Sequence, residues 1–254
     1  MELLLLGVLA LFAGFVDAIV GGGGLVQLPA LFGAYPGAPP ALLLGTNKMA
    51  GIAGTAVAAT RYLRRVRLPW AVLGPAVVGA LLFALLGARA VAWLPREAVR
   101  PLILVLLIVV AVYTFLRKDF GAVHAPRRSA AAAPWLGFAT GATLGFYDGF
   151  FGPGTGAFLM FVFVRLFGWD LLMASAAARV VNVATNFTAL AFFAATGNVL
   201  WLTGLVMASC NIAGSIAGSG LALARGTGFV RGVFLVVLAV LIAKFGWDTL
   251  AAWW

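Results

Sequence analysis

Long apolar segments separated by short polar ones follow one another along the whole chain. Most are long enough to cross a hydrocarbon core of about 30 Å as a helix. The segments lie at residues 3–20, 41–60, 69–88, 101–116, 134–151, 171–196, 200–223 and 232–250. They do not show the alternating polarity of a transmembrane β-barrel. The pattern therefore predicts an all-α polytopic membrane protein, because a helix satisfies its own backbone hydrogen bonds in lipid.

The sequence repeats itself at a constant offset. Gly14-Phe15-Val16-Asp17 recurs as Gly145-Phe146-Tyr147-Asp148, 131 positions later. The same offset pairs Gly21 with Gly152, Gly23 with Gly154, Lys48 with Arg179, Trp70 with Trp201 and Arg100 with Arg231. Such varied residue types do not match by chance in one ungapped register. We therefore predict a single membrane domain at 1–254, with one repeat at 3–116, a polar linker at 117–133 and a second repeat at 134–250.

The relative orientation of the repeats depends on residues 25–40 and their counterparts 156–170. If neither segment crosses the membrane, each repeat has four spans and the repeats are parallel. If both cross, each repeat has five spans and the repeats are inverted. Inversion places ten Lys or Arg residues, in loops 61–67, 117–133 and 225–231, on one side, and three, in loop 89–100, on the other. Because basic loops stay in the cytoplasm, this asymmetry favours inverted repeats.

Two glycine-rich segments, 21–24 and 152–156, interrupt apolar helices at matching places in the repeats. Relative to Ala, Gly costs a helix about 1 kcal/mol and Pro about 3 kcal/mol, so we expect both helices to break. Paired breaks of this kind form midplane binding sites in transporters, and we expect these two to meet there. The alternative is that the glycines only permit close packing. We interpret Gly214 and Gly218, in the small-residue stretch 208–220, as packing residues of that kind.

Lys48 and Arg179 lie inside predicted spans at matching repeat positions. A basic side chain at the membrane centre costs roughly 2.5–3.5 kcal/mol on insertion scales, so it usually faces a cavity or a partner. Two such cations favour an anion between them, because each contact at about 4 Å is worth about 4 kcal/mol at an effective dielectric of about 20. The alternative is one salt bridge within each repeat, Lys48 with Asp17 and Arg179 with Asp148, that only holds helices together.

Polar residues near each cation could donate hydrogen bonds to an anion. They are Asn47, Thr46 and Thr55 in the first repeat and Asn182, Thr185 and Asn186 in the second. Helices that begin after the breaks would add unpaired backbone N–H groups and positive dipole ends. The predicted substrate site, without metal or cofactor, comprises Lys48, Arg179, Asn47, Asn182, Asn186, Gly22, Gly23, Gly24, Gly154, Thr155 and Gly156.

Asp17 and Asp148 precede the two breaks at matching positions. A buried carboxylate is costly when charged, so it is either protonated or paired with a cation. Each is therefore a candidate for carrying a coupling proton or holding a sodium ion, and Lys48 is a rival proton carrier. The alternative is that each Asp only caps its broken helix.

Composition and charge narrow the function classes. Of the 254 residues, 64% are apolar and 9% are charged, against about 45–50% and 25% in soluble domains. The net charge of +10 would suggest nucleic acid in a soluble protein, but here most basic residues lie in loops, where membrane orientation explains them. The chain has one histidine, His124, and one cysteine, Cys210. An enzyme would need a nucleophile–base pair or a metal cluster, and these few residues offer neither. We therefore expect neither catalysis nor nucleic-acid binding.

The paired motifs Gly-Phe-x-Asp-x-x-x-Gly-x-Gly, at 14–24 and 145–156, are each followed by a basic residue, Lys48 or Arg179. They resemble the TauE/SafE family of sulfite exporters and related anion transporters over about residues 3–250. The resemblance implies a secondary transporter that moves sulfite, a sulfonate or another small organic or sulfur oxyanion across a bacterial inner (plasma) membrane, driven by an ion gradient. The family varies in substrate, and the motifs do not identify one.

Two other functions stay open. An anion channel also uses basic residues, and saturable, gradient-coupled flux would distinguish a transporter from it. A non-transporting assembly subunit would explain the helices but not the duplicated breaks with duplicated buried cations. The expected partners are a small anion, the lipid bilayer and a coupling proton or sodium ion, and a homodimer is left open.

Overall fold

The computed structural model describes residues 2–91, 121 and 131–251, and every regular element in these ranges is a helix. The predicted span at 101–116 and most of the predicted linker at 117–133 lie outside the described residues.

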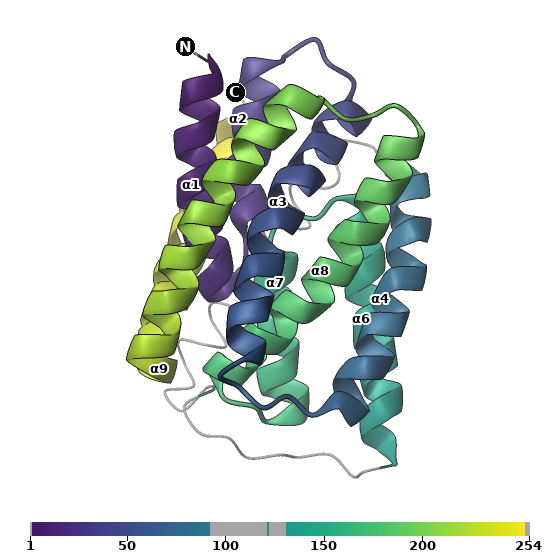
Figure 1. Cartoon of the computed structure of the whole chain (residues 1–254), viewed down its shortest axis with the longest axis vertical. Helices are drawn as coiled ribbons and strands as arrows, with labels where there is room; N and C mark the ends of the chain where they lie inside the picture. Colours follow the sequence, from purple (N-terminus) through teal and green to yellow (C-terminus); the bar gives the residue numbers. More distant parts are fainter. Residues whose placement is uncertain (1, 92–120, 122–130, 252–254) are drawn as a thin grey trace.

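The first group of helices starts with two that lie against each other. α1 (Glu2–Val20) ends at a short glycine segment, and α2 (Gly23–Ala34) turns back beside it. Two long helices follow, α3 (Pro40–Leu63) and α4 (Trp70–Ala90). Pro40 suits the first position of α3, because its φ is already helical and its missing N–H would be unpaired there. In Figure 1, α1 runs downwards, α2 upwards, α3 downwards and α4 upwards.

The second group has the same order of helices. α6 (Ala132–Phe150) ends at the second glycine segment, and α7 (Thr155–Val162) turns back and continues as the π-helical η2 (Phe163–Phe167). The long helices α8 (Leu171–Ala195) and α9 (Trp201–Ala251) follow. Figure 1 shows α6 running upwards, α7 downwards, α8 upwards and the first part of α9 downwards. Each direction is therefore the reverse of that of the corresponding helix in the first group.

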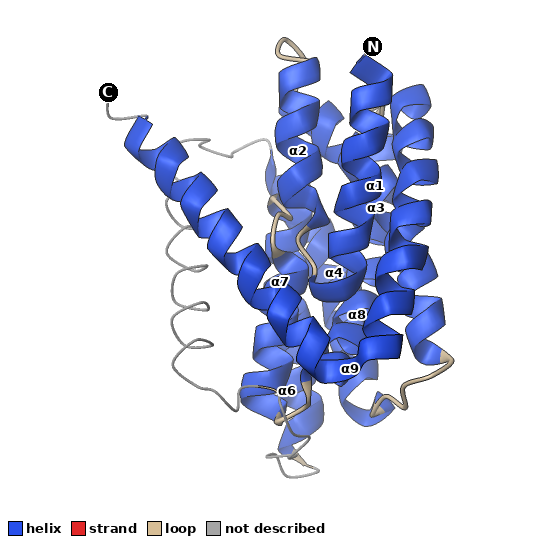
Figure 2. Ribbon diagram, turned by 90° about the vertical axis from the view of Figure 1, so that its left-hand side faces the viewer, coloured by secondary structure: helices blue, strands red, loops and turns tan. Residues whose placement is uncertain are grey.

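The predicted spans 200–223 and 232–250 are the two arms of α9. Gly226 separates them with a φ of 71° and a ψ of −163°, a conformation outside the helical region. In Figure 2, the second arm runs obliquely back upwards and away from the other helices.

Large apolar side chains cover the outside of the helical bundle. Leu4, Trp135 and Trp247 are 75%, 77% and 73% exposed, and many other Leu, Val and Phe residues accompany them. So much exposed apolar surface would be an aggregation liability in water. In the described ranges, α1, α4, α8 and the stretch Trp201–Val240 of α9 are long and apolar enough to cross a membrane. The outer surface thus suits lipid, while polar side chains are collected inside.

Small residues let two pairs of helices touch backbone to backbone. A Cβ added to Gly141 of α6 would collide with the carbonyl oxygen of Ala76 in α4. Cβ atoms added to Gly214 and Gly218 of α9 would collide with backbone atoms of α1. The prediction that Gly214 and Gly218 pack helices together is confirmed.

We expect Gly141→Ala to lower the free energy of unfolding by about 1–3 kcal/mol, the usual cost of forcing a group into a filled contact. Gly74→Ala in α4 is the control, since no atom lies within 4 Å of its added Cβ, and alanine favours the helix by about 1 kcal/mol. Thermal unfolding of both variants in detergent measures the difference. Equal melting temperatures would show that the α4–α6 contact tolerates a methyl group.

Candidate functional site

α1 ends in a turn that suits glycine. Gly21 and Gly22 have φ values of 86° and 97°, in the left-handed region that a residue with a Cβ avoids. Gly23, the first residue of α2, donates its N–H to Asp17 Oδ1 at 3.1 Å. Asp17 thereby satisfies one of the N–H groups that every helix start leaves unpaired, and it ties the end of α1 to the start of α2.

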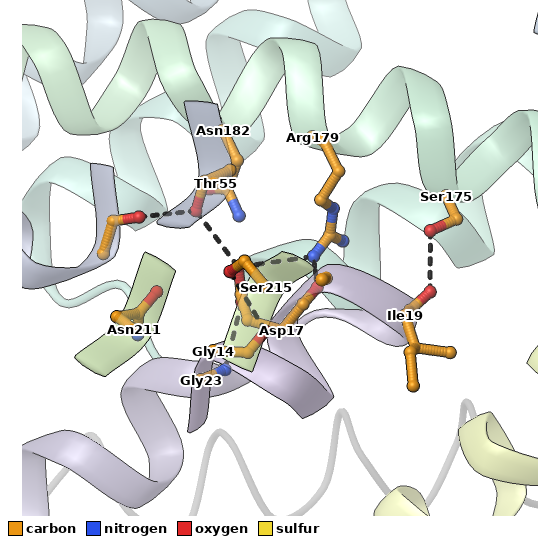
Figure 3. A network of polar contacts seen from close by, with 12 residues as sticks. Gly14, Asp17, Ile19, Gly23, Thr55, Ser175, Arg179, Asn182, Asn211 and Ser215 are labelled. Carbon is orange, nitrogen blue, oxygen red and sulfur yellow. Dashed lines mark hydrogen bonds and ion pairs between the residues drawn. The ribbon is translucent and has the colours of Figure 1, made fainter. Parts of the chain in front are cut away.

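Side chains from α3 and α8 cover the last carbonyl groups of α1. The hydroxyls of Tyr62 and Ser175 donate to the carbonyl oxygens of residues 18 and 19 at 2.9 and 2.6 Å. Nη1 of Arg179 donates to the carbonyl oxygen of Asp17 (Figure 3). Because the C-terminal end of a helix carries a partial negative charge, the guanidinium stabilises this end of α1.

The second break is built from a similar turn with different partners. Gly152 and Gly154 have φ values of 94° and 84°, and the hydroxyl of Tyr147 donates to the carbonyl oxygen of Pro153 at 2.6 Å. A Cβ on Gly152 would lie 2.9 Å from Lys48 Nζ. The absence of a side chain at Gly152 therefore makes room for the ammonium group of Lys48 beside the break.

The two breaks meet in the interior of the bundle, and Figure 2 shows them as neighbouring loops. A Cβ on Gly21 would lie 2.5 Å from Gly156 Cα, and one on Gly156 would lie 2.6 Å from Gly21 Cα. No side chain fits between these backbones. The starts of α2 and α7 therefore border one common space.

Two ion pairs surround this space. Lys48 Nζ lies 2.9 Å from Asp148 Oδ2, and Arg179 Nη1 lies 3.5 Å from Asp17 Oδ2. The salt bridges considered within each repeat, Lys48 with Asp17 and Arg179 with Asp148, are therefore wrong. Each cation instead pairs with a carboxylate of the other group of helices, Lys48 of α3 with Asp148 of α6 and Arg179 of α8 with Asp17 of α1.

A small cavity, of about 30 Å³, lies between the breaks. Its volume suits a water-sized group. The predicted residues in its wall are Lys48, Asn47, Thr55, Asn182, Asn186, Gly22, Gly23, Gly24, Gly154, Thr155, Gly156, Asp17 and Asp148. An ammonium group, two carboxylates, three carboxamides and two helix starts are thus brought together.

Arg179 and two predicted hydroxyl donors are not in the cavity wall. Arg179 is fully buried and held by Asp17. Thr46 Oγ1 accepts a hydrogen bond from the backbone N–H of Leu200 at 2.9 Å, and Thr185 Oγ1 donates to the carbonyl oxygen of Asn182 at 3.0 Å. We expected both cations to line one cavity. Lys48 lines it, and Arg179 does not.

Gln27, Gly51 and Asn211 also line the cavity, and the sequence reasoning did not include them. Gln27 and Asn211 are polar residues within apolar helices, which is itself a signal of function. Buried atoms without a hydrogen-bond partner in the described structure include Gln27 Nε2, Asn47 Oδ1 and Asn211 Oδ1. These side chains give the wall unused donors and acceptors.

The cavity wall contains two acidic side chains, Asp17 and Asp148. The described residues contain no group of three or more His, Cys, Asp or Glu side chains that could hold a metal ion. The ammonium, carboxylate and amide groups that are present can bind and release a small ion or a proton.

Comparison with known proteins identifies the family. The family model described as "Sulfite exporter TauE/SafE" matches residues 6–245. The chain belongs to this family. The resemblance seen in the glycine motifs is confirmed, and this TauE/SafE protein is a multi-pass membrane transporter, not an enzyme.

Curated relatives of this TauE/SafE protein carry transporter names. The Escherichia coli K12 "Probable membrane transporter protein YfcA" is 36% identical over 97% of this chain and 91% of its own length. "Probable membrane transporter protein ORF9" of Sinorhizobium sp is 37% identical over 93% and 89%, and a Haemophilus influenzae "Probable membrane transporter protein" is 32% identical over 93% and 91%. No solved structure matches the chain.

Proposed function

We propose that this TauE/SafE protein is a secondary transporter that moves a small anion across the bacterial inner membrane, coupled to a proton or sodium gradient. The substrate class is sulfite, a sulfonate or another organic or sulfur oxyanion, and the description of the matching family supports a sulfur oxyanion. The observation that carries the proposal is the cavity between the two breaks, where Lys48 meets carboxamides and the starts of α2 and α7.

Lys48 supplies the charge that selects an anion. Lys48 is only 2% exposed, and its Nζ points to the cavity between the breaks. An anion about 4 Å from this ammonium gains about 4 kcal/mol at an effective dielectric of about 20, before desolvation. Asn182 and Asn186 add amide donors, and the helix starts add N–H groups and positive dipole ends. Together these groups can replace the water around a small oxyanion.

The two groups of helices, α1–α4 and α6–α9, are inverted repeats in this proposal. The 131-residue offset, the shared order of helices and their reversed directions in Figure 1 support it. So does the packing of α1 on α9 and of α4 on α6, which are equivalent pairs under the offset. In transporters of this architecture, one repeat moves against the other around a fixed midplane site. Since the cavity is small, the breaks must separate to admit an oxyanion.

The test uses the purified protein with sodium salts of sulfite, methanesulfonate, sulfate, phosphate and acetate. A ligand at 100 times its dissociation constant should add about 2.7 kcal/mol of stability, seen as a rise in melting temperature. In proteoliposomes the same anion should accumulate only when a proton or sodium gradient is imposed. Flux that neither saturates nor follows the gradient would identify a channel, and the absence of stabilisation by every anion would argue against the site.

A further inference from the structure

The two ion pairs stand at matching sequence positions but have different surroundings. In the Arg179–Asp17 pair, Arg179 is fully buried and also donates to the backbone carbonyl of Asp17. The Asp17 carboxylate accepts further hydrogen bonds from Gly23 N and Thr55 Oγ1, each at 3.1 Å (Figure 3). Both oxygens of this carboxylate are thus occupied, and the pair holds α1, α2, α3 and α8 together.

The carboxylate of Asp148 has fewer hydrogen-bond donors around it than that of Asp17, although Arg179 Nε and Nη2 also lack hydrogen-bond partners in the described structure. Both residues line the cavity, and Asp148 Oδ2 lies 2.9 Å from Lys48 Nζ. Among the described residues, no hydroxyl, amide or backbone N–H group donates a hydrogen bond to Asp148 Oδ2. The nearby hydroxyl of Tyr147 donates to the carbonyl oxygen of Pro153 instead. Among the described residues, Lys48 is therefore the cation that neutralises the carboxylate of Asp148.

We propose that Asp148 is the coupling group, and that its carboxylate competes with the transported anion for Lys48. The idea rests on the proposed function. A proton that binds Asp148 Oδ2 forms an O–H bond and frees the ammonium of Lys48, which keeps its own protons. The anion then takes the place of the carboxylate. The Arg179–Asp17 pair stays closed throughout and acts as a positioning pair for the first break.

Charge balance favours this exchange. The empty site contains Lys48⁺ and Asp148⁻, and the loaded site contains Lys48⁺, neutral Asp148 and a monoanion, so its net charge is zero in both states. The other charged groups close to the site, Arg179 on α8 and Asp17 on α1, already neutralise each other. An anion without the proton would leave one uncompensated negative charge, which is costly in a buried site. One proton therefore accompanies each monoanion.

The experiment measures methanesulfonate binding to the purified protein as a function of pH. A sulfonate stays a monoanion across this range, so any pH dependence belongs to the protein. The affinity of the parent should tighten as the pH falls, by up to about tenfold per unit. Asp148→Asn should bind at least as tightly as the parent at the higher pH, with no pH dependence. Asp17→Asn should lower the melting temperature and retain the slope of affinity against pH.

A second measurement needs no variant. Methanesulfonate added to the weakly buffered parent should cause uptake of about one proton per bound anion. The inference is overturned if binding takes up no proton, if Asp148→Asn retains the slope, or if Asp17→Asn removes it. If no anion of the panel binds the parent at all, the proposed anion site itself is overturned, and the inference falls with it.

Discussion

Gly21→Ala should lower the free energy of unfolding strongly, although it adds only a methyl group. The φ of 86° at Gly21 is left-handed, which costs an alanine about 1–2 kcal/mol. The added Cβ would also lie 2.5 Å from the Cα of Gly156 in the second break, and such overpacking typically costs about 1–3 kcal/mol more. Thermal unfolding in detergent should show a large drop in melting temperature, together with loss of anion-induced stabilisation.

Gly22→Ala is the matched control. Gly22 has a similar φ of 97°, but its added Cβ would meet only the flexible end of the Leu25 side chain, at 3.3 Å. This variant should therefore suffer the backbone strain without the collision between breaks. Equal destabilisation by Gly21→Ala and Gly22→Ala would mean that the two breaks are not pressed together.

The helical architecture could be predicted because length and apolar character alone decide which segments suit lipid. The limits of α9 were harder to predict. Residues 200–223 and 232–250 look like two spans, and a polar stretch containing Arg225 separates them. The structure continues the helix on both sides of Gly226, since one glycine with a positive φ is enough to change its direction.

One part of the site could be predicted from the 131-residue offset, and the amides of Asn47, Asn182 and Asn186 from their closeness in sequence to Lys48 and Arg179. Matching positions led to Lys48, Asp148 and the glycine segments, which the cavity brings together. Gln27 and Asn211 were not predicted because the 131-residue offset pairs them with Phe158 and Ala80, and because neither lies close in sequence to Lys48 or Arg179. Asn211 also lies in the small-residue stretch 208–220, whose Gly214 and Gly218 pack against α1. The Asn211 side chain itself forms part of the cavity wall.

The crossed ion pairs could not be read from spacing either. Both pairs join the two groups of helices: Lys48 of α3 reaches Asp148 of α6, and Arg179 of α8 reaches Asp17 of α1. The sequence treats Lys48 and Arg179 as equivalents, whereas the structure places one at the cavity and the other behind the contact between the breaks. Equivalent positions therefore have different surroundings, the cavity wall for Lys48 and the C-terminal end of α1 for Arg179.

Lys48→Met should abolish anion-induced stabilisation and anion accumulation in proteoliposomes. Met preserves an unbranched, flexible chain but removes the cavity's ammonium group. It also leaves the carboxylate of Asp148, 3% exposed, without its partner, and breaking a buried pair in this way typically costs about 3–5 kcal/mol. The melting temperature of the empty protein should therefore fall as well.

The double variant Lys48→Met with Asp148→Asn separates the two effects. Without a charge at either position, most of the lost stability should return, because a neutral pair of similar volume leaves no uncompensated ion. Anion binding should not return, since no cation remains in the cavity wall. If the double variant still binds methanesulfonate, the anion's partner is not Lys48, and Arg179 becomes the group to examine. If stability stays low while Asp148→Asn alone is stable, Lys48 serves the fold through its packing rather than through its charge.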